Sequence, residues 1–196
     1  TKEDCEIISF LDSKAGENYV VLDGDLWRVC QFVKDSVAYD VVENSQVLSS
    51  AGYAFGRFQA MLADFPMEQL HETIPGFHNT SKRLADLFEI VEQDPLGRAQ
   101  DVEKEVEFFA RHKELATRLD KMLEAGEVPL RVTHNDTKYN NILMHKHTGK
   151  PLCVIDLDTV MPGLAMHDFG DAIRFAANTA EEDEPDLSKV GLNMDH

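Results

Sequence analysis

Apolar residues change their spacing near residue 43 of this 196-residue chain. Before that point they form short runs at 5–11, 19–22 and 26–33 that are rich in β-branched and aromatic side chains. Runs of this kind predict strands. Asp23 and Gly24 separate the last two runs, and an Asp-Gly pair between strand-forming segments is a strong signal for a tight hairpin turn. The N-terminal part therefore predicts β-structure organised around one hairpin.

Beyond residue 43 the apolar positions recur every three and four residues, from Val47 to Phe65. This spacing places them along one stripe of a helix. Pro66 cannot continue a helix and marks its end. The pattern predicts a central, buried helix of a helix-rich lobe.

The remaining pattern predicts alternating helices and strands after a loop at 70–80. Two amphipathic helices are expected at 84–91 and 102–123, and Gly126 ends the second. Short strands are expected at 129–133, 142–144 and 152–155, followed by a helix at 167–178.

Composition limits the classes of protein that fit this pattern. Hydrophobic residues make up 43% of the chain, which is enough to bury a core. The net charge of −17 would repel a phosphate backbone, so we expect no nucleic-acid partner. No run is long enough for a membrane helix and no secretion signal is present, so we expect a soluble, cytoplasmic protein. Cys5, Cys30 and Cys153 lie in apolar contexts and are expected to be buried thiols outside any disulfide.

The residues with most chemical information lie in the polar stretch 133–143, between two predicted strands. His134, Asp136 and Asn141 follow the order and spacing of the kinase catalytic loop, His-x-Asp with Asn five residues later. Asp156 and Asp158 follow the strand predicted at 152–155. Paired with such a loop, carboxylates at a strand end indicate phosphoryl transfer.

Each of these residues has an expected role in that chemistry. Asp136 would accept the proton of the attacking hydroxyl, and Lys138 would place positive charge on the transferring group. Asn141 and Asp156 would bind the metal, because magnesium prefers oxygen ligands. Asp158 is left open between support of the metal and ordinary capping. His134 is expected to shape the loop by hydrogen-bonding backbone.

Three further features have a structural interpretation. Asp168-Phe169-Gly170 spells the metal motif of protein kinases but falls within a predicted helix, so Asp168 and Asp171 are expected to hold the catalytic loop or to cap that helix. The acidic run 181–184 is expected to be a solvated loop. His145 and His147 are expected to be solvent-exposed, since no cysteine pair accompanies them as zinc would require.

The chain resembles the aminoglycoside phosphotransferase and choline kinase superfamily at His134, Asp136, Asn141, Asp156 and Asp158. The longer strings 133–141 and 155–163, with the loop 74–78, are similar to those of bacterial N-acetylhexosamine 1-kinases. The resemblance implies an α+β, protein-kinase-like fold with two lobes. Residues 1–34 would be a remnant of the small β lobe and the hinge, and residues 35–196 the large, mainly helical catalytic lobe.

The same resemblance implies the reaction and its cofactor. The chain would move the γ-phosphate of ATP to a hydroxyl of a small molecule, an N-acetylhexosamine at the anomeric position, with Mg2+ as the metal. The backbone of the hinge, at Cys30, Gln31, Phe32 and Val33, would bind the adenine.

Two alternatives remain open at this point. The acceptor could be choline, homoserine or an aminoglycoside, and the acidic charge would suit a cationic acceptor such as choline or an aminoglycoside. The chain could also be a truncated, non-catalytic kinase-like module, because neither a glycine-rich loop nor a strand lysine that would bind ATP is found in it. We expect both upstream of Thr1, and weak ATP affinity and negligible turnover without them. The sequence does not indicate an oligomeric state.

Overall fold

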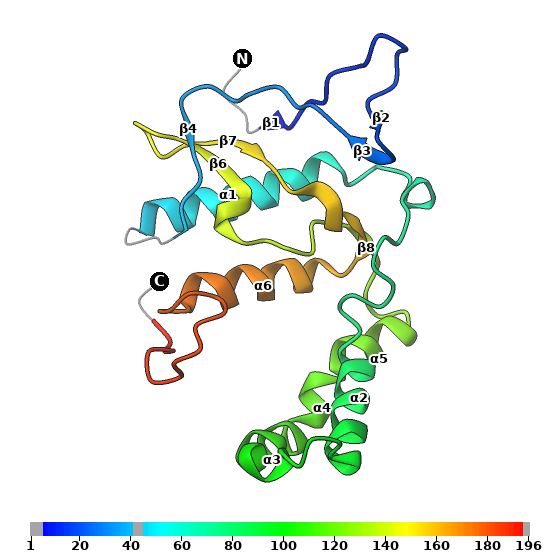
Figure 1. Cartoon of the computed structure of the whole chain (residues 1–196), viewed down its shortest axis with the longest axis vertical. Helices are drawn as coiled ribbons and strands as arrows, with labels where there is room; N and C mark the ends of the chain where they lie inside the picture. Colours follow the sequence, from blue (N-terminus) through cyan, green and yellow to red (C-terminus); the bar gives the residue numbers. More distant parts are fainter. Residues whose placement is uncertain (1–5, 41–44, 194–196) are drawn as a thin grey trace.

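The computed structural model describes residues 6–40 and 45–193, so Cys5 lies outside the described residues. The fold is α+β, with small sheets and helices along the whole described chain (Figure 1). The strands are β1 Glu6–Ile7, β2 Val20–Leu22, β3 Asp25–Trp27, β4 Ser36–Val37, β5 Arg131–Thr133, β6 Ile142–His145, β7 Pro151–Val154 and β8 Met161–Gly163. The α-helices are α1 Ser45–Met61, α2 Thr80–Gln93, α3 Glu103–Arg111, α4 Lys113–Ala116, α5 Arg118–Glu124 and α6 Ala165–Ala177.

The largest sheet has the strand order β1-β7-β6-β4. Strands β6 and β7 form an antiparallel hairpin, and β4 adds to the outer edge of β6. On the other edge β1 runs parallel to β7, with Glu6 opposite Cys153. This sheet joins strands from both sides of residue 34, so the N-terminal segment is hydrogen-bonded to the hairpin that follows the predicted catalytic loop, residues 134–141.

The predicted β-hairpin is confirmed as β2 and β3, with Leu22 paired to Asp25. Asp23 and Gly24 form its two-residue turn, and both have positive φ (55° and 91°), as a type I′ turn requires. The strand predicted at 26–33 is wrong in length, because β3 ends at Trp27. Beyond it the backbone makes single hydrogen bonds to residues 9 and 11, which leaves no regular strand.

Helix α1 packs its apolar face against the sheet, as Figure 1 shows, and the predicted central helix is confirmed. The helix ends at Met61, four residues before the end of the predicted stripe. The buried core consists of Val47, Ala51, Ala54, Phe55 and Phe58 of α1 with Tyr139, Ile142, Met144 and Val154 from the catalytic loop and its hairpin.

Helices α2 to α5 extend away from the sheet as a helical arm (Figure 1). The single helix predicted at 102–123 is wrong, because the chain is divided there into α3, α4 and α5. At the first break His112 Nδ1 lies 2.8 Å from the carbonyl oxygen of Phe108, and at the second Thr117 Oγ1 donates to the carbonyl of Lys113 at 3.0 Å. Side-chain bonds to the preceding turn compete with the helical ladder and bend it.

The helix predicted at 167–178 is confirmed as α6, and it follows the short antiparallel pair of β5 and β8. Cys153 is buried in β7 as predicted. Cys30 is exposed, so its predicted burial is wrong, because the segment after β3 is not covered by other described residues.

Gly163 of β8 offers a test of how closely β5 and β8 pack. A Cβ atom at this position would overlap Thr133 Oγ1 and lie 2.9 Å from Asn135 Oδ1. We expect Gly163→Ala to lower the free energy of unfolding by about 1–3 kcal/mol, as overpacking does. Gly170→Ala in α6 is the matched control, since its Cβ would meet no atom within 4 Å. Urea denaturation of both variants would measure the difference, and equal stability would contradict the close approach.

Candidate active site

The catalytic loop is held by Asp168, which lies in the first turn of α6 and is only 3% exposed. Its Oδ1 accepts the backbone N–H of Asn135 at 2.8 Å, and its Oδ2 accepts that of His134 at 3.0 Å. The side chain of Gln59 in α1 donates to Oδ2 at 2.7 Å. The prediction that Asp168 holds the loop is therefore confirmed.

Asn135 has a φ of 67°, in the left-handed region that non-glycine residues seldom adopt. Its side chain compensates by donating to the carbonyl of Thr159 at 2.8 Å, while Thr159 Oγ1 donates to the carbonyl of His134 at 2.7 Å. Thr133 Oγ1 in turn donates to the carbonyl of Met161 at 3.0 Å. Surrounding contacts of this kind are what keeps a strained loop conformation in place.

His134 is fully buried and sits against the ring edges of Phe55 and Phe58, at 5.3 and 5.7 Å between ring centroids. Its Nε2 lies 2.9 Å from the carbonyl oxygen of Ile155, which can only accept, so Nε2 carries the proton. Nδ1 then accepts the backbone N–H of Asp136 at 3.4 Å. Both ring nitrogens bond backbone, which confirms that His134 shapes the loop.

The structure brings Asp136, Lys138 and Asn141 together. Asn141 Nδ2 donates to Asp136 Oδ2 and to its carbonyl oxygen, both at 2.9 Å. Lys138 Nζ lies 3.4 Å from Asp136 Oδ1. Burial alone would lower the pKa of Lys138, but the hydrogen bond of Glu182 and the charge of Asp136 outweigh it and raise the pKa. Asp136 is thus oriented by an amide and placed beside a charged ammonium.

Asp156 and Asp158 differ in their surroundings. Asp156 follows β7 with φ 57° and ψ 59°, and its exposed side chain has no hydrogen bond or ion pair with the described residues. Asp158 forms an ion pair with Arg28 at 2.9 Å. The carboxylate of Asp158 is therefore engaged with the N-terminal segment, whereas that of Asp156 is open to a ligand.

The donors available for a metal are the Asp156 carboxylate and Asn141 Oδ1, since Asn141 Nδ2 is committed to Asp136. Ile155 N–H donates to the carbonyl of Asn141 at 2.9 Å, which brings the segment bearing Asp156 alongside Asn141. Within residues 6–40 and 45–193, no three His, Cys, Asp or Glu side chains converge as a metal site. Two hard oxygen donors fit Mg2+, which usually retains several waters and binds substrate phosphates.

The predicted hinge residues are only partly gathered at one cavity. Gln31, Phe32 and Val33 line a cavity of about 370 Å³ together with Leu152 and Cys153. Cys30 does not line this cavity; its backbone pairs with that of Phe10 in an isolated antiparallel β-bridge. Phe32 is 80% exposed, so much of its ring faces away from the described chain. Their role in binding adenine stays a prediction.

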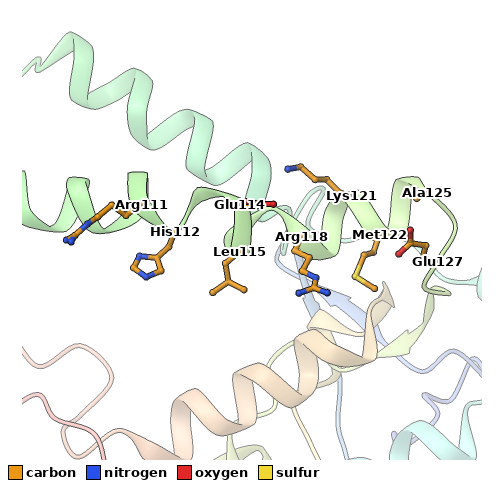
Figure 2. A pocket seen from close by; sticks show the side chains of 9 residues that line it. All are labelled: Arg111, His112, Glu114, Leu115, Arg118, Lys121, Met122, Ala125 and Glu127. Atoms are coloured by element: carbon orange, nitrogen blue, oxygen red, sulfur yellow. The ribbon is translucent and has the colours of Figure 1, made fainter.

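A larger cavity, of about 650 Å³, lies along the helical arm and contains none of the predicted site residues. Figure 2 shows Leu115, Arg118 and Met122 projecting from the same side of the arm. The residues that line this cavity are Arg111, His112, Glu114, Leu115, Arg118, Lys121, Met122, Ala125 and Glu127. The chain pattern did not indicate it, because cations and apolar residues alternate there as on an ordinary exposed helix.

The structure also adds a residue to the site that the sequence did not indicate. Glu182, in the acidic run expected to be solvated, accepts from Lys138 Nζ at 3.1 Å and from Arg174 at 3.0 Å. The run lies in an exposed loop as predicted, but at Glu182 two cations also hold the side chain against the catalytic loop. Asp171 behaves as predicted, since its Oδ2 accepts the backbone N–H of Thr137 at 2.8 Å.

A comparison with known families gives a match that covers nearly all of the chain. Residues 11–190 match APH, the phosphotransferase enzyme family. In the part of the chain that the structure describes, every helix is too short or too polar to cross a membrane.

Substitution of Asp168 would test its role in holding the loop. In Asp168→Asn one of the two carboxylate oxygens becomes an NH2 donor, which would face the backbone N–H of either His134 or Asn135 and leave that buried donor unpaired. We expect unfolding to become easier by about 1–3 kcal/mol, which is the cost of one such group. Asp183→Asn, an exposed position, is the control, and urea denaturation measures both. Equal stability of the two variants would show that Asp168 does not hold the loop.

Proposed function

The chain belongs to the phosphotransferase enzyme family, and on that premise we propose that it transfers the γ-phosphoryl group of ATP to a hydroxyl group of a small molecule. The observation that carries this proposal is the arrangement around Asp136. Its carboxylate is oriented by Asn141 at 2.9 Å, lies 3.4 Å from Lys138 Nζ, and sits on a loop anchored to α1 and α6.

Asp136 would act as the base of this reaction. The acceptor hydroxyl gives its proton to the carboxylate while its oxygen attacks the γ-phosphorus. A new oxygen–phosphorus bond forms as the bond to the β–γ bridging oxygen breaks, and ADP leaves with that electron pair. The hydrogen bond from Asn141 fixes one carboxylate oxygen and so directs the other toward the acceptor.

Lys138 would stabilise negative charge on the transferring phosphoryl group. It is a compact, rotatable cation beside Asp136, and its side chain is 22% exposed, so it is accessible to a bound phosphoryl group. A fixed positive charge in a partly dry site acts more strongly than one in water.

Asn141 and Asp156 would hold Mg2+, which when bound would neutralise charge on the phosphate oxygens. Asp158, predicted as a third metal residue, is paired with Arg28, so we propose the other two as the ligands. The cavity beside Gln31, Phe32 and Val33 would receive the adenine, since its wall is formed partly by apolar side chains such as Ile7 and Leu152.

For the acceptor we propose an N-acetylhexosamine phosphorylated at its anomeric hydroxyl, in cytoplasmic carbohydrate metabolism. The strings 133–141 and 155–163 and the loop 74–78 support this choice. The net charge of −17 favours a second candidate, a cationic acceptor such as choline or an aminoglycoside. The intact Asp136, Asn141 and Asp156 speak against a non-catalytic module.

Replacement of Asp136 tests the proposed base. Asp136→Asn keeps the size of the side chain but cannot take up a proton, so acceptor-dependent ADP release should fall by about 10²- to 10⁴-fold. The assay uses the full-length protein with ATP, Mg2+ and a panel of N-acetylhexosamines, choline, homoserine and aminoglycosides. Asp101→Asn on the helical arm is the control and should keep full activity. Turnover by Asp136→Asn at the normal rate would exclude Asp136 as the base.

A further inference from the structure

We propose that Glu182 is a positioning residue for phosphoryl transfer. It holds the ammonium group of Lys138 beside Asp136 and prevents it from forming a closer ion pair with the Asp136 carboxylate. This proposal rests on the roles proposed above for Asp136 and Lys138. It assigns a function to one side chain of an acidic segment, 181–184, that otherwise resembles ordinary solvated surface.

The ammonium of Lys138 lies between two carboxylates. Lys138 Nζ is 3.1 Å from Glu182 Oε2 and 3.4 Å from Asp136 Oδ1. The shorter contact is with Glu182, which therefore takes the stronger hydrogen bond. Without Glu182, Asp136 would be the nearest carboxylate, and the ammonium would be drawn onto the oxygen that has to receive the acceptor's proton.

Glu182 is itself fixed by a closed ring of contacts. Arg174 Nη2 donates to Glu182 Oε1 at 3.0 Å and to Asp171 Oδ1 at 2.9 Å. Asp171 Oδ2 accepts the backbone N–H of Thr137 at 2.8 Å. The contacts thus leave the catalytic loop at Lys138 and return to it at the preceding residue. A ring of this kind fixes the direction of the lysine side chain as well as its charge.

The segment that presents Glu182 is closed at its base. Asn193 N–H donates to the carbonyl of Ala177 at 2.8 Å, and Thr179 N–H donates to that of Gly191 at 3.2 Å. The residues between form a compact loop whose ends lie together, the arrangement of an Ω-loop. This closure holds Glu182 at the end of α6 rather than on a free tail.

The other acidic residues of the run do not share this role. Glu184 pairs with Lys189 at 3.2 Å within the same loop. Within the described residues, the side chains of Glu181 and Asp183 have no hydrogen bond or ion pair. Of the four, Glu182 alone reaches the catalytic loop in the described part of the chain, so its contact is specific to its position.

The charge of Glu182 has a measurable consequence at Lys138. Burial would lower the pKa of the lysine, and the hydrogen bond that Lys138 donates to Glu182 is the first of the contacts that raise it instead. Because Glu182 is 43% exposed, water screens the pair and its contribution to stability is small. We therefore expect its removal to be seen in the pKa of Lys138 and in turnover rather than in folding.

The test compares Glu182→Gln with Glu181→Gln, which makes the same change of charge one residue away. In full-length protein carrying lysine labelled with 13C at the ε carbon, an NMR pH titration follows Lys138. Glu182→Gln should lower the pKa of Lys138, and Glu181→Gln should leave it unchanged. An unchanged pKa in Glu182→Gln would overturn the proposal.

Kinetics then decide whether the contact serves catalysis. With a saturating acceptor, Glu182→Gln should lower kcat by roughly 10- to 100-fold, the range seen when a supporting partner is removed, with the acceptor KM little changed. In a Lys138→Met background the same substitution should cost nothing further. An equal loss without Lys138, or no loss at all, overturns the positioning role. If Asp136→Asn turns over at the normal rate, both the proposed function and the positioning role fail. If Asp136→Asn is inactive but Glu182→Gln is fully active, only the positioning role fails, so the two failures are distinguishable.

Discussion

The buried carboxylate of Asp168 is the contact on which the rest of the site depends. A carboxylate withdrawn from water is costly unless donors replace its hydration. Here the donors are the side chain of Gln59 on α1 and the backbone N–H groups of His134 and Asn135. Two elements far apart in sequence therefore satisfy one group on a third element, α6. Because these hydrogen bonds fix His134 and Asn135, they also fix the position of Asp136, the next residue along the loop.

The loop separates its structural polar groups from its reactive ones. Thr133, His134, Asn135 and Thr137 are buried, and each bonds backbone or Asp168 and Asp171. A buried polar network stabilises one conformation only when its members are satisfied. The side chain of Asp156 is exposed, and that of Asp136 is 24% exposed and contacts Asn141 and Lys138 rather than the buried groups that shape the loop. Rigidity and reactivity are thus assigned to different residues of the same short stretch.

Local sequence signals were sufficient for the β2–β3 hairpin, for α1 and for the roles of His134 and Asp168, because turn chemistry, periodicity and motif spacing act within a few residues. The parallel pairing of β1 with β7 could not be predicted, since it joins Glu6 to Cys153 across most of the chain. The breaks of the helical arm depend on side-chain bonds such as that of His112, which apolar periodicity does not record. Glu182 was missed for a similar reason: four acidic residues in a row look alike until a lysine 44 positions away selects one of them.

The charge balance of the site also constrains how a phosphate co-substrate would bind. Lys138, Arg174 and Arg28 are all paired with carboxylates of the chain itself, so they leave little net positive charge near the catalytic loop. With a net charge of −17 as well, these three cations of the described chain attract a polyanion only weakly at this point. The proposed Mg2+ at Asn141 and Asp156 would supply a stronger attraction. Because Asp156 has no cationic partner among the described residues, its carboxylate is available for a metal in a way that Asp158 is not. The pairing of nearby cations and the openness of Asp156 would then belong to one arrangement, in which the metal attracts the phosphates and Lys138 acts on the transferring group.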